Sequence, residues 1–242
     1  MVLPLDTMLT STVAPALRAE GFKRKGRRFV IVNELGDLAL IEISTSGKLA
    51  LGDGYRHFWV HPWLLPEPFA DLWRFRGAPY PVGWEQAVPL WEVKPRSPFV
   101  SSMPADALWA FKEDDPAQVM ECGLAVVEAL VPAVVSILRR LLDRQTLIDE
   151  VGRADVLPLL SRESSPLKLL FVGGYGRTLL PLLADAGDAA AVAGLMRDRQ
   201  EGWLLTASRE GNRYATSLID WATDRLAARG AGDLKAMLGM PA

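Results

Sequence analysis

The spacing of hydrophobic positions changes near residue 116. Before it, apolar residues in several segments recur at every second position, which is typical of half-buried strands. After it, they recur at the i, i+3, i+4 and i+7 spacing of amphipathic helices. This change predicts an α+β fold: an N-terminal helix, a small antiparallel sheet covered by a long helix, and an all-helical C-terminal segment.

The first predicted element is a helix over residues 6–20. Asp6 is suited to cap its N-terminus, and Gly21 supplies a C-terminal stop. Pro15 conflicts with an uninterrupted helix, because proline lacks a backbone donor and crowds the carbonyl four residues earlier. The sequence therefore predicts either a kink at Pro15 or a late helix start.

Strand signals occupy the next hundred residues. Two apolar, β-branched runs at 28–32 and 38–43 flank the polar segment 33–37, which predicts a hairpin. Further strands are expected at 55–60 and at 90–93, with turn residues around the first of them. We expect three to five antiparallel strands in total.

The second half of the chain predicts a series of helices. The longest covers 119–142 and should pack on one face of the sheet, with Pro132 marking a kink or a boundary between two helices. The other predicted helices share amphipathic spacing and end at glycine or aspartate turns: 166–184, 189–199, 214–229 and 233–238. We therefore predict two domains, an α+β domain at residues 1–152 and a helical unit at 153–242.

Composition narrows the class of protein. The single cysteine, Cys122, excludes an internal disulfide and favours a reducing compartment. The first residues lack a signal-peptide pattern, so a cytoplasmic location is expected. The apolar stretch 123–138 is shorter than the roughly 20 residues that span a bilayer, so we expect a buried helix and no membrane association. The net charge of −2 disfavours general attraction to nucleic acid.

The sharpest local feature is a run of positive charges at Lys23, Arg24, Lys25, Arg27 and Arg28. We expect this run to be a loop at the entry to a strand, in which alternate side chains face the same way, so three of the five can converge on a phosphate or an acidic partner. The alternative is a solvated segment whose charges keep the edge of the sheet from pairing with other chains. Nucleic-acid binding is disfavoured, because no stacking aromatic residue is interleaved with the charges.

The basic run lies within a longer pattern. Residues 17–29, LRAEGFKRKGRRF, resemble the opening of a bacterial domain-of-unknown-function family numbered 4304. The resemblance implies a leading helix, a basic turn into a hairpin, a small antiparallel sheet and a closing helical segment. A looser similarity in hydrophobic pattern extends to about residue 151. The family supplies no catalytic residues, and for function the resemblance implies an immunity or accessory protein beside a toxin.

Tryptophans are concentrated in the middle of the chain. Five of the eight fall within a proline-rich segment: Trp59, Trp63, Trp73, Trp84 and Trp91. Aromatic residues at this density either fill a core between sheet and helix or line a recognition surface.

The chemistry-bearing residues do not form a recognisable catalytic pattern. His57 and His61 share one face of a predicted strand but lie roughly 13 Å apart by strand rise, too far to share a metal on a straight strand. The glycine-rich segment 173–178 lacks the Gly-Lys-Ser/Thr ending of a phosphate-binding loop. Cys122 lies in an apolar run, where a thiol behaves as a small hydrophobe. We predict no catalytic residue, metal site or cofactor.

Three functional hypotheses remain. The first is a binding protein that uses the basic run and the tryptophan segment against a protein partner. The second is an enzyme or binder acting on a phosphorylated or acidic small molecule, which would require Lys25 or Arg27 to meet His57 or His61 and a carboxylate. The third is nucleic-acid binding, whose affinity would fall steeply with salt.

Overall fold

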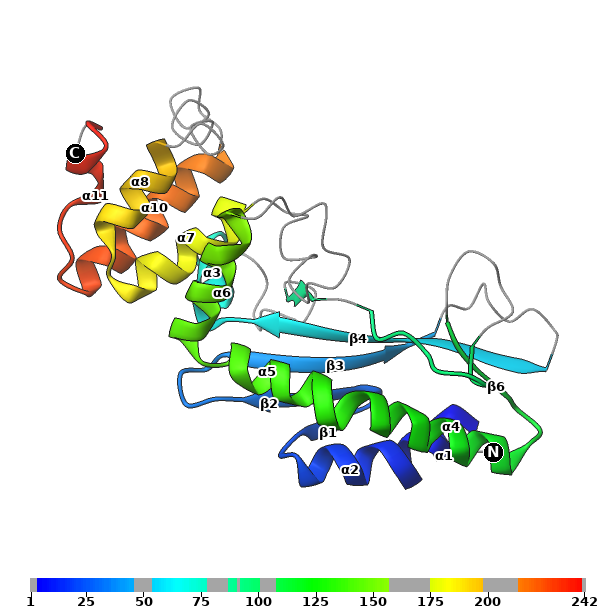
Figure 1. The fold of residues 1–242 in the computed structure, drawn as a ribbon. Coiled ribbons are helices and arrows are strands. Elements are labelled where there is room, and N and C mark those ends of the chain that lie inside the picture. Colours follow the sequence, from blue (N-terminus) through cyan, green and yellow to red (C-terminus); the bar gives the residue numbers. More distant parts are fainter. Residues whose placement is uncertain are drawn as a thin grey trace. The chain divides into compact units, whose positions relative to one another are not determined.

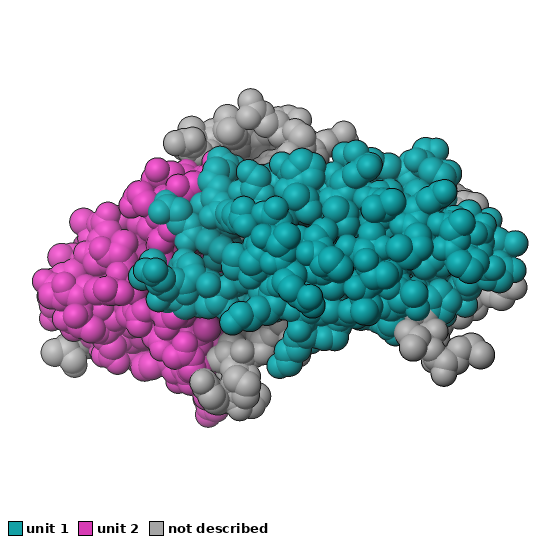
Figure 2. All heavy atoms as spheres, turned by 90° about the horizontal axis from the view of Figure 1, so that it is seen from below, with its two compact units in different colours: residues 1–64, 89–143 teal, residues 65–88, 144–242 magenta. Residues whose placement is uncertain are grey.

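The computed structural model describes residues 4–45, 54–77, 87–90, 92–100, 108–156, 175–197 and 213–240. The chain divides into two compact units, coloured separately in Figure 2. Unit 1 comprises residues 1–64 and 89–143, and unit 2 comprises 65–88 and 144–242. Compared with the predicted division at 152, the boundary falls at 143, and a segment from the middle of the chain belongs with the C-terminal helices.

Unit 1 is built around an antiparallel sheet (Figure 1). Its strands are β1 (Lys23–Lys25), β2 (Arg28–Val32), β3 (Leu38–Ser44), β4 (Tyr55–Leu65), β5 (Val88–Pro89) and β6 (Trp109–Lys112). Strands β1 to β5 follow one another in chain order, and β6 pairs with β4. The α+β prediction and the hairpin of β2 and β3 are confirmed.

Two strands differ from the prediction: one was missed, and one is displaced along the chain. The pattern missed β6, which is four residues long. The segment predicted as a strand at 90–93 runs beside β4, because Leu90 N donates to Pro62 O and Val93 N donates to Val60 O. The regular strand assigned there is the preceding pair, Val88–Pro89.

The two faces of the sheet differ in character. Phe29 pairs with Ile41 across β2 and β3, and both side chains are fully buried. On β4, the Phe58 ring lies 6.1 Å from Trp109 and 6.0 Å from Phe111, measured between centroids. These residues form the core face. The alternate positions, including Arg28 and its cross-strand partner Glu42, therefore point to the outer face.

Two helical segments pack against each other in unit 1. The first runs through α1 (Pro4–Met8), η1 (Leu9–Val13) and α2 (Ala14–Ala19). The second runs through α4 (Pro116–Ala129), η4 (Leu130–Val135) and α5 (Ser136–Leu141). Figure 1 shows both along the same side of the sheet. They meet closely at Gly123, where an added Cβ would lie 2.9 Å from Met8 Cγ and 3.0 Å from Thr12 Cβ.

Both helical prolines follow or occupy a widened turn. Pro15 comes directly after the π-helical η1, in which Ala14 N donates to Leu9 O five residues earlier. Pro132 lies inside the π-helical η4. A π turn accommodates the missing donor of proline without ending the helix. The sequence predicted a kink or a break at these positions, and the structure has continuous helices with a local change of winding.

The helix Pro116–Leu141 is longer than the apolar run that the sequence suggested. Its 26 residues, with a mean hydropathy of 1.9 in the most apolar window, are long and apolar enough to cross a membrane by length and composition. The length argument made for residues 123–138 therefore does not extend to the whole helix, and the expectation of no membrane association stays a prediction. In the structure one side of it is buried in the core of unit 1, through residues such as Val119, Cys122 and Val126.

Unit 2 is built mainly from helices. Its helices are α3 (Glu67–Phe75), α6 (Arg144–Val156), α7 (Tyr175–Ala186), α8 (Ala189–Arg197), α10 (Arg213–Ala228) and α11 (Leu234–Met237). The predicted helical C-terminal part is confirmed, and the tight turn between α7 and α8 uses Gly187 at φ 78°. Helix α3 was not predicted. Residues 166–174, expected to be the first part of α7, lie outside the described residues.

Candidate functional site

The predicted basic run forms the hairpin of β1 and β2, which we call the basic hairpin (residues 23–28). Strand β1 stands at the end of the strand order, so it is an edge of the sheet. Gly26 turns the chain with a φ of 63°, in the region that favours glycine. Lys25 lies opposite Arg28 in the register, and Lys23 lies opposite Val30.

Two of the hairpin arginines are held by carboxylates. Arg27 Nε donates to Asp6 Oδ1 at 3.1 Å, and its Nη1 donates to Thr45 Oγ1 at 3.1 Å. Arg28 Nε donates to Glu42 Oε1 at 2.9 Å, between directly paired residues of β2 and β3. Asp6 was expected to cap the first helix; it lies in the first turn and binds the hairpin. These pairs fix the hairpin against the helix and the neighbouring strand.

The other three basic residues of the run, Lys23, Arg24 and Lys25, form no ion pair with a carboxylate among the described residues. Arg24 donates to two neutral oxygens, Gly26 O and Thr10 Oγ1, both at 2.7 Å. Lys23 and Lys25 are exposed. Residues that face each other across paired strands share a face, so Lys23, Lys25 and Arg28 all lie on the outer side. The hairpin thus brings Lys23 and Lys25 to one face together with Arg28, which Glu42 compensates, and the convergence of three charges on a phosphate or an acidic partner stays a prediction.

The structure describes three of the five tryptophans of the predicted interaction surface. Trp59 and Trp63 alternate along β4 on its outer face, and both are half-buried. Trp73 is half-buried on α3 in unit 2, with the guanidinium carbon of Arg76 4.9 Å from its ring centroid. Trp84 and Trp91 lie outside the described residues.

The two histidines belong to the same outer face of β4. His57 is buried, 4% exposed, and its ring lies 6.4 Å from that of Tyr55. His61 lies between the tryptophans in sequence, with its ring 6.3 Å from Trp63. Burial lowers the pKa of His61 below 6.5, although the negative charges of Glu92 and Glu42 oppose this shift. His61 is therefore mostly neutral at neutral pH.

The outer face thus carries charged groups beside aromatic rings. Arg28 pairs with Glu42, and Lys94 Nζ lies 2.9 Å from Glu92 Oε2. Among the described residues Arg27 contacts Asp6 and Thr45, and it contacts no histidine, as an acid-base site on this hairpin would need. The face offers charge and aromatic contact for recognition.

The described residues were expected to hold neither a reactive thiol nor a metal site, and the two features that bear on this are the surroundings of Cys122 and the grouping of metal-ligating side chains. Cys122 is buried in α4, and burial raises the pKa of its thiol to about 12. It is therefore protonated at neutral pH, and a thiol in that state is a poor nucleophile and metal ligand. Within the described ranges, no group of three or more His, Cys, Asp or Glu side chains is placed to hold a metal ion.

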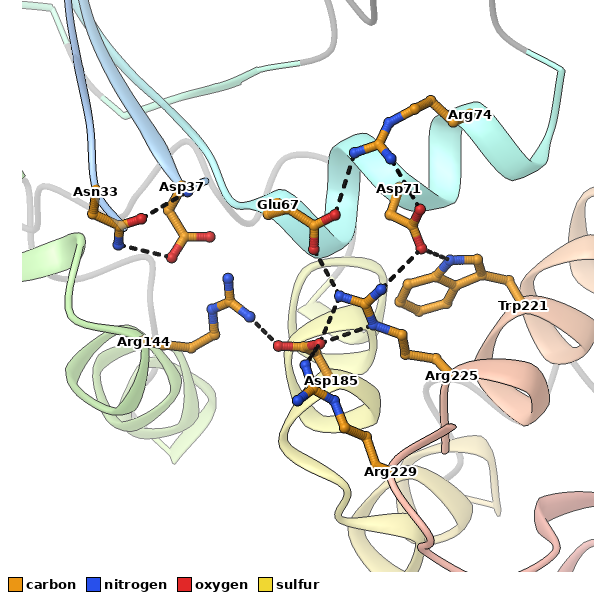
Figure 3. A network of polar contacts seen from close by, with 10 residues as sticks. All are labelled: Asn33, Asp37, Glu67, Asp71, Arg74, Arg144, Asp185, Trp221, Arg225 and Arg229. Carbon is orange, nitrogen blue, oxygen red and sulfur yellow. Dashed lines mark hydrogen bonds and ion pairs between the residues drawn. The ribbon is translucent and has the colours of Figure 1, made fainter. Parts of the chain in front are cut away.

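Unit 2 contains a network of ion pairs that the sequence did not suggest (Figure 3). Arg225 on α10 lies at its centre. Its Nη2 is 2.7 Å from Glu67 Oε2, its Nη1 is 3.2 Å from Asp71 Oδ2, and its Nε is 2.8 Å from Asp185 Oδ1. Trp221 Nε1 also donates to Asp71 Oδ2, at 3.0 Å. The network joins α3, α7 and α10.

Asp185 is the most buried member of this network. Its side chain is 5% exposed, and it contacts the guanidinium groups of Arg144, Arg225 and Arg229. Burial alone would raise the pKa of Asp185, but the hydrogen bonds and charges of the three arginines outweigh it and lower the pKa below 3.8. The carboxylate is ionised and compensated, which is the condition for keeping a charge in the interior.

A weak signal of the network is visible in the sequence. Glu67 and Asp71 are four residues apart, as are Arg225 and Arg229, so each pair shares a helix face. Sequence spacing cannot show that these two faces meet, because they are separated by more than 150 residues. The network has satisfied carboxylates and a buried centre, so we interpret it as a structural element of unit 2.

Comparisons with known proteins give no further guide to the site. No protein-family model matches the chain, and no curated protein and no solved structure matches it. The resemblance of residues 17–29 to the family numbered 4304 stays a prediction.

Proposed function

We propose that this chain is a binding protein that recognises an acidic surface of a protein partner through the basic hairpin. One observation carries the proposal: among the described residues, Lys23, Arg24 and Lys25 contact no carboxylate, while Arg27 and Arg28 are fixed by Asp6 and Glu42. The hairpin is thus held in place at the sheet edge and retains positive charge. Pre-organised charge of this kind speeds association and selects partners of opposite sign.

Two further features support a protein partner. Trp59 and Trp63 lie on the outer face of β4 in the same sheet, and tryptophan and arginine are enriched at the energetic centres of protein interfaces. The resemblance to the family numbered 4304 implies an immunity or accessory protein, which acts by binding another protein. We do not assign a catalytic step.

The test is retention of partners on the immobilised chain. The native chain is expected to retain one stoichiometric acidic protein from a lysate of its own cells and to bind poly-glutamate, with both released as salt rises. Charge reversal at Lys23 and Lys25 should abolish both. A matched reversal at Lys112 and Lys235, which lie elsewhere, should preserve them.

Two outcomes would contradict the proposal. Equal retention by both double variants would remove the hairpin from the binding surface. Preference for short duplex DNA or for inorganic phosphate over poly-glutamate would favour the nucleic-acid or small-molecule hypothesis.

A further inference from the structure

The exposed side of the helix Pro116–Leu141 carries a continuous stripe, which we call the outer stripe. Its members are the exposed residues Ala117, Met120, Glu121, Leu124, Glu128, Pro132, Ser136, Arg139 and Arg140. Leu124 is 55% exposed and Met120 is 39% exposed, so the stripe presents two large apolar side chains to solvent.

The π turn η4 keeps the stripe in phase. If the helix were α-helical throughout, the spacing of 3.6 residues per turn would place Val135 on the same side as Leu124 and Glu128, so Val135 would be exposed. In the structure Val135 is buried, and Ser136 takes the exposed position. The widened turn at Leu130–Val135 shifts the phase by about one residue. The exposed side therefore runs without a break from Ala117 to Arg140, about 35 Å at 1.5 Å per residue.

The charges of the stripe are divided between its two halves. Glu121 and Glu128 lie in the N-terminal half, and Arg139 and Arg140 lie in the C-terminal half. Arg139 also pairs with Glu20 at 2.8 Å, which holds it at the end of the helix. A second stripe laid antiparallel, crossing near Val131, brings Glu121 of one copy opposite Arg140 of the other. Leu124 then meets the region of Ser136.

We propose that the outer stripe is a self-association surface, which pairs with the same stripe of a second copy in antiparallel orientation. The division of charge makes the surface complementary to itself under a two-fold axis, as an isologous interface requires. Antiparallel helices also place opposite ends of their dipoles side by side. A lipid surface fits less well, because two carboxylates would enter the apolar layer with Leu124.

The size of the stripe sets the strength of the dimer. A surface about 35 Å long and about 10 Å wide is smaller than the interface of a stable dimer. The two copies of Glu128 also approach each other near the crossing point, which weakens the contact. We therefore expect reversible dimers with dissociation constants in the micromolar range or weaker.

Sedimentation velocity of the full chain from about 5 μM to about 500 μM tests the proposal. The mass should rise with concentration toward twice the 26.5 kDa of one chain. Leu124→Glu should weaken dimerisation at least about tenfold. Phe75→Glu changes an equally exposed apolar residue in unit 2 and should leave dimerisation unchanged. Circular dichroism and thermal melts show that each variant is folded.

A charge exchange tests the orientation. Glu121→Arg and Arg140→Glu should each weaken self-association, and an equimolar mixture of the two variants should restore it. A monomer throughout the concentration range, a dimer that survives Leu124→Glu, or a mixture that fails to recover would overturn the proposal. So would sedimentation with neutral phosphatidylcholine vesicles that depends on Leu124.

Discussion

Single residues decide how closely the helices of unit 1 approach. Gly123 faces Met8 and Thr12 so closely that a methyl group would lie within 3.0 Å of both side chains. The contacted atoms, Met8 Cγ and Thr12 Cβ, are near the backbone, so they cannot move aside cheaply. Glycine is therefore required here by packing, although it is an unfavourable residue in a helix interior.

Gly123→Ala is expected to lower the free energy of unfolding by about 1–3 kcal/mol, because overpacking outweighs the gain in helix propensity. Urea unfolding monitored by circular dichroism measures the effect. Gly194→Ala is the matched control, because Gly194 is an exposed residue of α8 with no atom within 4 Å of an added Cβ. That variant should gain up to about 1 kcal/mol. If Gly123→Ala instead raised the free energy of unfolding, the packing argument would be contradicted, because α4 and the N-terminal helical segment would then move apart at little cost.

Asp185 illustrates the same dependence on surroundings for a charged residue. Three guanidinium groups converge on its carboxylate, and removing the carboxylate leaves them repelling one another. We expect Asp185→Asn to destabilise unit 2 by about 3 kcal/mol, the scale for breaking a buried ion pair. Thermal melts measure the loss. Asp188→Asn is a suitable control, because its N-cap contact with Ala191 N can be kept by asparagine.

At the scale of elements, ion pairs explain why α3 belongs with the C-terminal helices. Glu67 and Asp71 of α3 both contact Arg225 of α10 through different nitrogens of one guanidinium group. The planar fork of arginine matches several carboxylates at fixed angles, which the single ammonium of lysine cannot do. The contact therefore depends on the identity of the residue as well as on its charge.

Arg225→Lys should lower the free energy of unfolding by about 1–2 kcal/mol although it conserves charge, because at least one hydrogen bond to a charged group is lost. Denaturant unfolding of the variant checks this value. The reverse exchange Lys235→Arg, at a single ion pair with Asp220, should change stability by less than about 0.5 kcal/mol. Similar values for the two variants would contradict a central role for the guanidinium fork.

At the scale of the whole molecule, the stability of the chain in acid should depend on Asp185. The pKa of Asp185 is lower in the folded chain than in the unfolded chain, so the folded state binds this proton less readily. Its contribution to stability is present above about pH 3.8 and is lost as pH falls through the lowered folded value.

Calorimetry between pH 7 and pH 2 should therefore show a transition that moves to lower temperature below about pH 3.8. In Asp185→Asn this acid-dependent part should be absent, because the residue no longer titrates. An unchanged pH dependence in the variant would mean that other carboxyl groups control acid unfolding.

The sequence alone determined the α+β class, the hairpin around residues 33–37 and the helical second half, because these follow from local hydrophobic period and turn residues. It also located the basic hairpin, since charge density is a local property. It missed α3 and β6: both are short, and their assignment depends on partners elsewhere in the chain. For the same reason it placed the domain boundary at 152 and overlooked Arg225.

Only the tertiary structure decided which charges are compensated. Arg27 and Arg28 find Asp6 and Glu42 through the folding of a helix and a strand onto the hairpin, whereas Lys23 and Lys25 stay exposed. Asp185 is ionised in the interior because three arginines from distant segments reach it. Local sequence specifies the period of an element, but the pairing of side chains is set by packing between elements that sequence distance does not reveal.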